Sequence, residues 1–150
     1  MTLPKTLILR HRRENLKKCS LQPLSSRHDF HFLSYPKDPL PDLSSYLLLK
    51  VGAPPLTLED KDKGIFLIDA TWRLASIMER QCPPVEERSL PAHFRTAYPR
   101  RQTLCPDPEQ GLASIEAIFL AYWILQRSTE GLLDGYFWKN SFLKINNLTE

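Results

Sequence analysis

Short segments with the hydrophobic pattern of β-strands occur through the first half of the chain. They are Leu3–Arg10, His28–Leu33, Ser44–Val51 and Gly64–Asp69. The third and fourth segments contain continuous apolar runs, which are typical of strands buried on both faces of a sheet. Because helical segments separate the apolar runs, the pattern predicts an α/β protein with a mostly parallel sheet and flanking helices.

The helical periodicity lies in the second half. Apolar side chains follow one helical face over Trp72–Gln81, where Pro83 and Pro84 stop the run. A long, strongly apolar helix is predicted over residues 112–127, and an amphipathic one over Glu130–Ile145. Between the helices, Ser89–Tyr98 is predicted to be extended or irregular and Pro99–Gly111 to be a loop.

The length and composition predict one compact domain. The chain has 150 residues, of which 42% are hydrophobic and 25% charged, as in ordinary globular proteins. Proline is abundant, with 13 residues, whereas glycine is scarce, with 5, so stiff connections are expected. Neither a Walker lysine motif nor a Rossmann glycine fingerprint occurs, which excludes nucleotide binding by those two routes.

Other classes of protein are disfavoured by what the sequence lacks. It shows no secretory signal and no apolar stretch of the length of a membrane span, so we expect a cytoplasmic protein without a membrane partner. Cys19, Cys82 and Cys105 lack the paired spacing of zinc ligands and are expected to be reduced thiols. His28 and His31 would lie on opposite faces of a strand, and no metal site is expected.

The positive charge is concentrated in two segments. The formal net charge is only +3, yet residues 1–18 hold six basic residues against Glu14 alone. A second group, Arg95, Arg100 and Arg101, lies close to Phe94 and Tyr98, which offer stacking surfaces. Both segments have the composition of a nucleic-acid contact, and both are equally compatible with an ordinary solvated surface.

One acidic and one aromatic residue follow the predicted strand Gly64–Asp69. Asp69 ends the strand and Trp72 begins the next helix. In open parallel sheets, ligands bind beyond the carboxyl ends of the strands, so both residues are candidates for a ligand site. The alternative is that Asp69 caps the helix and Trp72 belongs to the core. No motif for a serine nucleophile is present.

Four ordered blocks of sequence resemble one known superfamily. They are Gly64–Trp72, Arg88–Pro91, Gly111–Ala117 and Tyr136–Asn146, and Lys17–Ser20 adds an amino-terminal Lys-Lys-Cys-Ser. The series resembles the DTW-domain and rRNA aminocarboxypropyltransferase superfamily, and its carboxyl-terminal block is more similar to the rRNA branch. The chain departs from the series at Leu21, Ala113 and Lys139, where the family has glycine, serine and glycine.

The resemblance implies a fold, a reaction and a cofactor. The fold is SPOUT-like with a carboxyl-terminal trefoil knot, formed by a single domain over residues 1–150. Residues 1–50 would be a basic, strand-containing region and residues 51–150 the cofactor-binding region. The implied reaction transfers the 3-amino-3-carboxypropyl group of S-adenosylmethionine to a uridine or pseudouridine of RNA, with small-subunit rRNA favoured and a monomeric enzyme expected.

The resemblance also implies the residues of the site. Contacts to S-adenosylmethionine are expected from Ser20, Leu49, Val51, Trp72, Leu90, Leu112 and Ala117, and Asp69 is the candidate catalytic residue near the target base. The candidate RNA-binding residues are Arg10, Arg12, Arg13, Lys17, Lys18, Arg100 and Arg101. The alternatives are a tRNA uridine aminocarboxypropyltransferase of the DTW type, a SAM-dependent RNA methyltransferase and a non-catalytic RNA-binding relative.

Overall fold

The structure, a computed structural model, describes residues 3–12, 20–99 and 111–150. Its centre is a five-stranded sheet of order β2-β1-β4-β3-β5 in which every pair of neighbours is parallel. The strands are β1 (Thr6–His11), β2 (Phe30–Tyr35), β3 (Tyr46–Leu49), β4 (Gly64–Asp69) and β5 (Glu86–Arg88). The α-helices of the described residues are α1 (Trp72–Gln81), α2 (Ser114–Ile124) and α3 (Lys139–Ile145), and short 3-10 turns cover Gln22–Leu24 and Leu58–Asp60.

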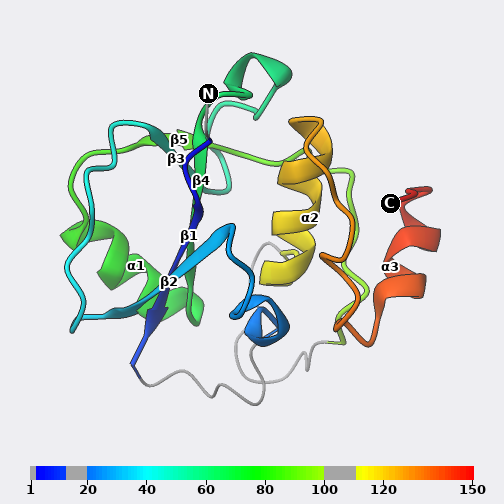
Figure 1. Cartoon of the computed structure of the whole chain (residues 1–150), viewed down its shortest axis with the longest axis horizontal. Coiled ribbons are helices and arrows are strands. Elements are labelled where there is room, and N and C mark those ends of the chain that lie inside the picture. Colours follow the sequence, from blue (N-terminus) through cyan, green and yellow to red (C-terminus); the bar gives the residue numbers. More distant parts are fainter. Residues whose placement is uncertain (1–2, 13–19, 100–110) are drawn as a thin grey trace.

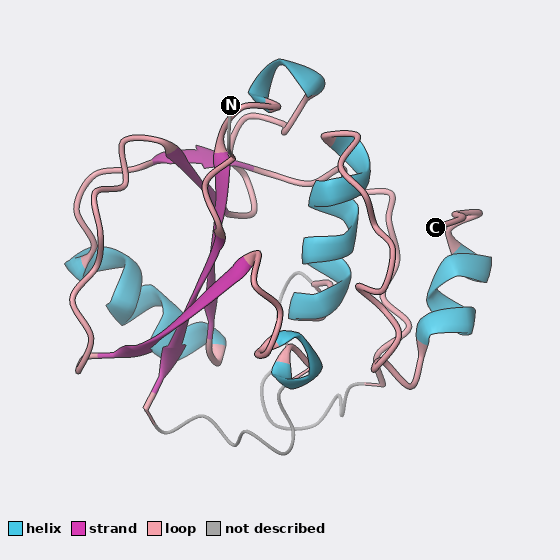
Figure 2. Cartoon of the chain, in the orientation of Figure 1, coloured by secondary structure: helices cyan, strands magenta, loops and turns pink. Residues whose placement is uncertain are grey.

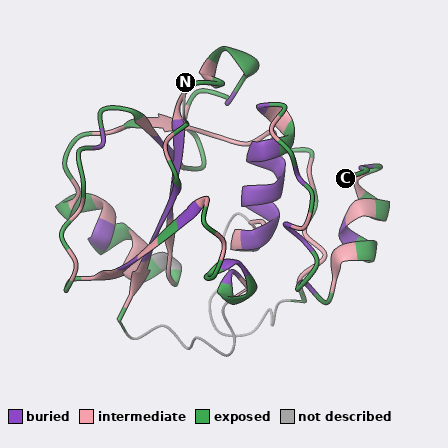
Figure 3. Ribbon diagram, in the orientation of Figure 1, coloured by how far each residue is buried: buried purple, intermediate pink, exposed green. Residues whose placement is uncertain are grey.

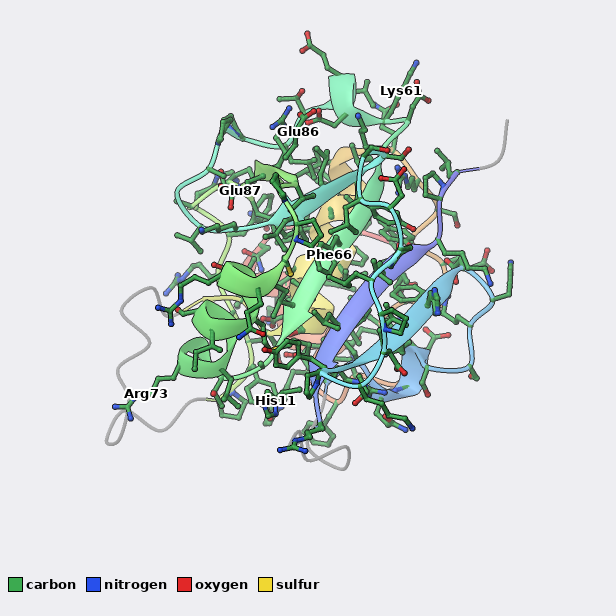
Figure 4. All side chains as sticks on the ribbon, turned by 90° about the vertical axis from the view of Figure 1, so that its left-hand side faces the viewer. His11, Lys61, Phe66, Arg73, Glu86 and Glu87 are labelled. Carbon is green, nitrogen blue, oxygen red and sulfur yellow. The ribbon has the colours of Figure 1, made fainter. Side chains whose placement is uncertain are left out.

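The sheet separates two hydrophobic cores. Alternate residues of a strand point to opposite faces, so Ile8 packs into one core whereas Leu7 and Leu9 pack into the other. Helix α1 covers the second face, and α2 covers the first, as Figures 1 and 2 show. Figure 4 views the molecule from the α1 side, where Phe66 of β4 lies in the middle of the sheet.

Helix α2 is the central element of the larger core. Eight of its eleven residues are buried, because the sheet packs against one side of it and the carboxyl-terminal segment against the other. Figure 3 shows α2 as the most completely buried helix, and Figure 1 shows α3 beyond it, away from the sheet. A helix that is apolar on all sides is expected in such a position.

Much of the predicted framework is confirmed. The bounds of β4 and α1 agree with the prediction, and β1, β2 and β3 lie within or beside the predicted segments. The prediction of a parallel sheet is also confirmed. Most of the predicted loop Pro99–Gly111 lies outside the described residues. Within the described part of the chain, no helix is long and apolar enough to cross a membrane.

Two predictions of secondary structure were wrong. Strand β5 was missed because its sequence Glu-Glu-Arg is polar, and it adds to the sheet edge through backbone pairing with β3. The predicted helix Glu130–Ile145 is helical only over α3, since the residues before it form turns. Gly131 has a φ of +78°, in the left-handed region, which interrupts a regular helix, and Gly135 lies too close to Pro23 to carry a Cβ. Helix α2 also begins and ends inside the predicted range 112–127.

Candidate functional site

Asp69 and Arg10 lie side by side at the carboxyl edge of the sheet. They are register partners at the ends of β4 and β1. Ile8 and Leu67, two residues earlier in each strand, belong to the core that contains α2. By the alternation of side chains along a strand, Asp69 and Arg10 therefore face the same side as α2.

The first turn of α2 contacts this edge directly. Ser114 donates a hydrogen bond from Oγ to Oδ1 of Asp69, with 2.6 Å between the two oxygens. Both side chains belong to half-buried residues. The alternative raised by the sequence was that Asp69 serves as a cap for α1, whose N-cap position is held by Thr71 without a side-chain hydrogen bond. The hydrogen bond from Ser114 connects Asp69 with the first turn of α2.

Ser20 caps the same helix from a distant part of the chain. The N-cap residue of α2 is Ala113, whose methyl side chain has no oxygen to accept a backbone N–H. The Oγ of Ser20 accepts this bond from the N–H of Ile115 at 3.2 Å. Ser20 is thus fixed beside Ser114 and Asp69, and three residues that the sequence placed in separate blocks meet at one helix turn.

Glu116 connects that turn to two further segments. It is fully buried, with 0% of its surface exposed. Its Oε1 accepts hydrogen bonds from Thr96 Oγ1 at 2.6 Å and from the Ala113 N–H at 2.8 Å. Its Oε2 accepts bonds from the Ala97 N–H and the Tyr136 hydroxyl, each at 2.9 Å. The carboxylate accepts two hydrogen bonds at each oxygen, which fills the acceptor positions of this group.

Asn146 holds the same segment from the side of α3. Its Oδ1 accepts a hydrogen bond from the Arg95 N–H at 2.8 Å, and its Nδ2 donates to the Arg95 carbonyl at 2.9 Å. The backbone of residues 95–97 is therefore bound by α2 on one side and by α3 on the other. This segment follows Leu90, one of the residues expected to contact the cofactor.

Only some of the predicted cofactor contacts are enclosed by other residues. Ala117 is buried, whereas Leu49, Leu90 and Leu112 are half-buried and pack against the core of α2. Val51 lies beyond the end of β3 with 65% of its surface exposed. Trp72 provides the first residue of α1, and its side chain lies outside the part of the structure that is described.

The basic residues expected to bind RNA are only partly described. Arg10 donates from Nη1 to Oε1 of Gln22 at 3.0 Å, and its guanidinium lies 4.6 Å from the centre of the Phe32 ring. Arg12 is exposed just after β1. The others, Arg13, Lys17, Lys18, Arg100 and Arg101, lie outside the described residues. Figure 4 shows the neighbouring His11 and Arg73 at one end of the molecule and Glu86 and Glu87 toward the other.

Another cation at this edge is already neutralised. Lys50 follows β3 and lies 3.3 Å from a carboxylate oxygen of Glu79 and 3.3 Å from one of Glu87. The attraction of Glu79, with hydrogen bonds to both acids, raises the pKa of the Lys50 ammonium. Lys50 therefore contributes less to a positive surface than Arg12 does.

The structure accommodates two of the departures from the family series directly. Leu21 is completely buried in the core of α2. Lys139 begins α3, where it lies 3.0 Å from Asp134 and forms an ion pair with Glu150. Hydrogen bonds to Glu150 and Asp134 raise the pKa of this lysine. The third departure, Ala113, occupies the N-cap position of α2, and Ser20 provides the capping oxygen that the alanine side chain lacks.

The roles of Ser114, Glu116, Tyr136 and Asn146 were not predicted. All four lie in the sequence blocks that carry the resemblance, but the hydrophobic pattern says nothing about their partners. One local signal was available for Glu116, because an acidic residue three positions after an N-cap is half of a capping box. Among the described residues, no cluster of histidine, cysteine, aspartate and glutamate could hold a metal ion.

Comparison with known proteins gives a structural match. No protein-family model matches the sequence, and no curated protein matches it. Among solved structures, the fold is similar to that of the SAM-dependent rRNA:acp-transferase Tsr3 from Vulcanisaeta distributa, with a TM-score of 0.74 and 23% sequence identity. The match covers 97% of this chain and 80% of that one. The two proteins therefore share a fold.

Proposed function

We propose that this chain is an S-adenosylmethionine-dependent aminocarboxypropyltransferase that modifies a uridine or pseudouridine of small-subunit rRNA. The observation that carries the proposal is the convergence of the motif blocks at the first turn of α2. Asp69, Ser20 and Tyr136 each come from a different block, and each is hydrogen-bonded to a residue of that turn. The fold is similar to that of an enzyme named as an rRNA:acp-transferase, which also supports the proposed function.

Residues at the sheet edge and at the beginning of α2 would supply the contacts that S-adenosylmethionine requires. Leu90, Leu112 and Ala117 would supply backbone groups and apolar surface to the adenosine, and the half-buried Leu112 and buried Ala117 lie at the beginning of α2. Ser20 would contact the chain that is transferred. Leu49, Val51 and Trp72 would enclose the methyl group, so that the aminocarboxypropyl carbon faces the acceptor.

The proposed transfer is a displacement at carbon. The base nitrogen forms a bond to the terminal carbon of the aminocarboxypropyl chain, the bond from that carbon to sulfur breaks, and methylthioadenosine leaves with the electron pair. The base N–H proton must also be lost. Asp69 lies at the sheet edge beside the proposed cofactor residues, and it would accept this proton or orient the base.

The proposal extends to the fold and the partner. The domain over residues 1–150 would be SPOUT-like with a carboxyl-terminal trefoil knot, as the resemblance implies, and it would act as a monomer in the cytoplasm. Arg10 and Arg12 at the sheet edge, with Arg13, Lys17, Lys18, Arg100 and Arg101, would contact RNA phosphates. The target base has to be unpaired or flipped to reach Asp69.

Isotope labelling tests the reaction. The purified chain is incubated with total RNA and S-adenosylmethionine labelled either in the carboxyl carbon or in the methyl group. We expect the carboxyl label alone to enter RNA, in the small-subunit rRNA fraction. Label in tRNA would identify the DTW-type reaction instead. Methyl label alone would identify a methyltransferase, and RNA binding without either label would identify a non-catalytic relative.

A pair of aspartate variants tests the site. Asp69→Asn should slow single-turnover transfer by about a hundredfold or more while cofactor affinity is largely kept. Asp42→Asn is the matched control, because Asp42 is an exposed carboxylate bonded to Ser44 in the connection between β2 and β3. An Asp69→Asn enzyme with the single-turnover rate of the Asp42→Asn enzyme would exclude the proposed role of Asp69.

A further inference from the structure

Glu116 binds together both ends of the chain segment that precedes α2. Thr96 and Ala97 lie before the segment and Ala113 lies after it, and all three donate hydrogen bonds to the one carboxylate. Tyr136, from the segment before α3, donates the fourth bond. The carboxylate thus fixes two separate parts of the chain against a single helix turn.

The hydrogen bonds of the Glu116 carboxylate argue against a direct chemical role for this residue. An ionised carboxylate offers about four acceptor positions, and Glu116 has two donors at each oxygen. The residue is also fully buried. Moving a carboxylate from water into the protein interior costs free energy, and well-placed hydrogen-bond donors offset this cost. The function of Glu116 is therefore to hold its hydrogen-bond donors in position.

The helix turn that Glu116 organises is the one that faces the proposed cofactor site. Ala113 is its bonded neighbour, Ser114 carries the hydrogen bond to Asp69, and Ile115 donates to Ser20. A displacement of this turn would move the backbone groups of Leu112 and Ala117 together with it. The position of the cofactor-binding backbone therefore depends on the acid at the third position of the helix.

We propose that Glu116 and Tyr136 are positioning residues that set the affinity for S-adenosylmethionine without contacting it. The inference rests on the proposed function and adds to it a role for the carboxyl-terminal segment, which is distant from Asp69 in sequence. Loss of the Tyr136 hydrogen bond loosens the turn, and cofactor affinity falls. The chemical step is less affected, because bound cofactor restores the turn.

Two tyrosine-to-phenylalanine variants separate positioning from general stability. Tyr136→Phe removes the 2.9 Å bond from the buried phenol to Glu116. Tyr122→Phe removes a 2.5 Å bond between another buried phenol of the same core and Thr6, together with a 3.4 Å bond from that phenol to Asp29. Each variant loses one buried hydroxyl with its hydrogen bonding, so decreases in Tm of the same order are expected. Thr6 lies at the beginning of β1, away from the carboxyl edge.

Isothermal titration with S-adenosylmethionine gives the decisive measurement. We expect Tyr136→Phe to weaken binding by about fivefold, the size expected for one hydrogen bond, and Tyr122→Phe to leave it unchanged. In turnover assays Tyr136→Phe should raise KM for the cofactor with kcat nearly kept. Glu116→Gln replaces one acceptor oxygen by a donor amide, and its folded protein should bind the cofactor more weakly still.

The alternative outcomes are distinct. Equal losses of affinity in both tyrosine variants would overturn the inference, because stability alone would then explain them. Unchanged affinity in Tyr136→Phe, with binding by the unmodified protein, would also overturn it and leave the proposed function standing. Failure of the unmodified protein to bind S-adenosylmethionine would overturn the proposed function and this inference together.

Discussion

The capping of α2 by Ser20 gives a prediction with a built-in rescue. Ser20→Ala removes the oxygen that accepts the Ile115 N–H, and Ala113 at the N-cap position cannot replace it. An N-cap serine changed to alanine costs about 1 kcal/mol of the free energy of unfolding. For a domain of this size, about 1 kcal/mol lowers Tm by about 2–4 °C.

The rescue places the missing oxygen in the helix itself. Ala113 has the extended backbone of an N-cap residue, with φ −64° and ψ 154°, so a serine there can accept a bond from the first turn. Ala113→Ser should change the stability of the unmodified protein by only a few tenths of a kcal/mol, because Ser20 already serves as the cap. In the Ser20→Ala protein it should recover most of the loss.

Urea unfolding of the four proteins in this cycle measures the coupling. We expect a coupling free energy of about 1 kcal/mol between positions 20 and 113, since the two side chains compete for one function. Ser25→Ala is the matched control: its hydroxyl bonds to the Gln22 carbonyl in the neighbouring turn, and Ala113→Ser should not offset its removal. Additive effects of Ser20→Ala and Ala113→Ser, within about 0.3 kcal/mol, would refute the capping argument.

Three further predictions concern other parts of the molecule. Burial raises the pKa of Tyr122 to about 12. The protonated phenol therefore contributes about 2–3 kcal/mol to the free energy of unfolding below pH 10, and this contribution is lost as the pH rises to 12. Urea unfolding should show the loss in the unmodified protein relative to Tyr122→Phe. Gly135→Ala should lower the free energy of unfolding by about 1–3 kcal/mol, because the added methyl would overlap the Pro23 ring, and an unchanged urea midpoint would contradict that packing. Arg12→Ala should weaken RNA binding and reduce its salt dependence, whereas Arg80→Ala, at the other end of α1 from the sheet edge, should not; equal effects in filter-binding assays would exclude a specific contact.

The elements nearest to the proposed chemistry were predictable because their signals are local. The uninterrupted apolar run of β4 and the helical periodicity of α1 meet at Asp69, which the sequence alone places at the end of a strand. Parallel pairing brings Asp69 to the same edge as Arg10, although among the described residues α1 is the only α-helix that lies between two strands of the sheet. Strand β5 lacked such a signal, since its pairing depends on the backbone and not on apolar side chains.

The partners of the site residues were decided by the tertiary structure alone. Hydrophobic periodicity reports which positions are buried, but it does not report which distant atom a buried polar group will meet. Ser20 and Ile115 are 95 residues apart, and Asp69 and Ser114 are 45 apart. Their hydrogen bonds exist because the sheet and the buried helix α2 pack in one arrangement. The sequence determined the kinds of elements and the candidate acid, whereas the packing of α2 on the carboxyl edge assembled them into a site.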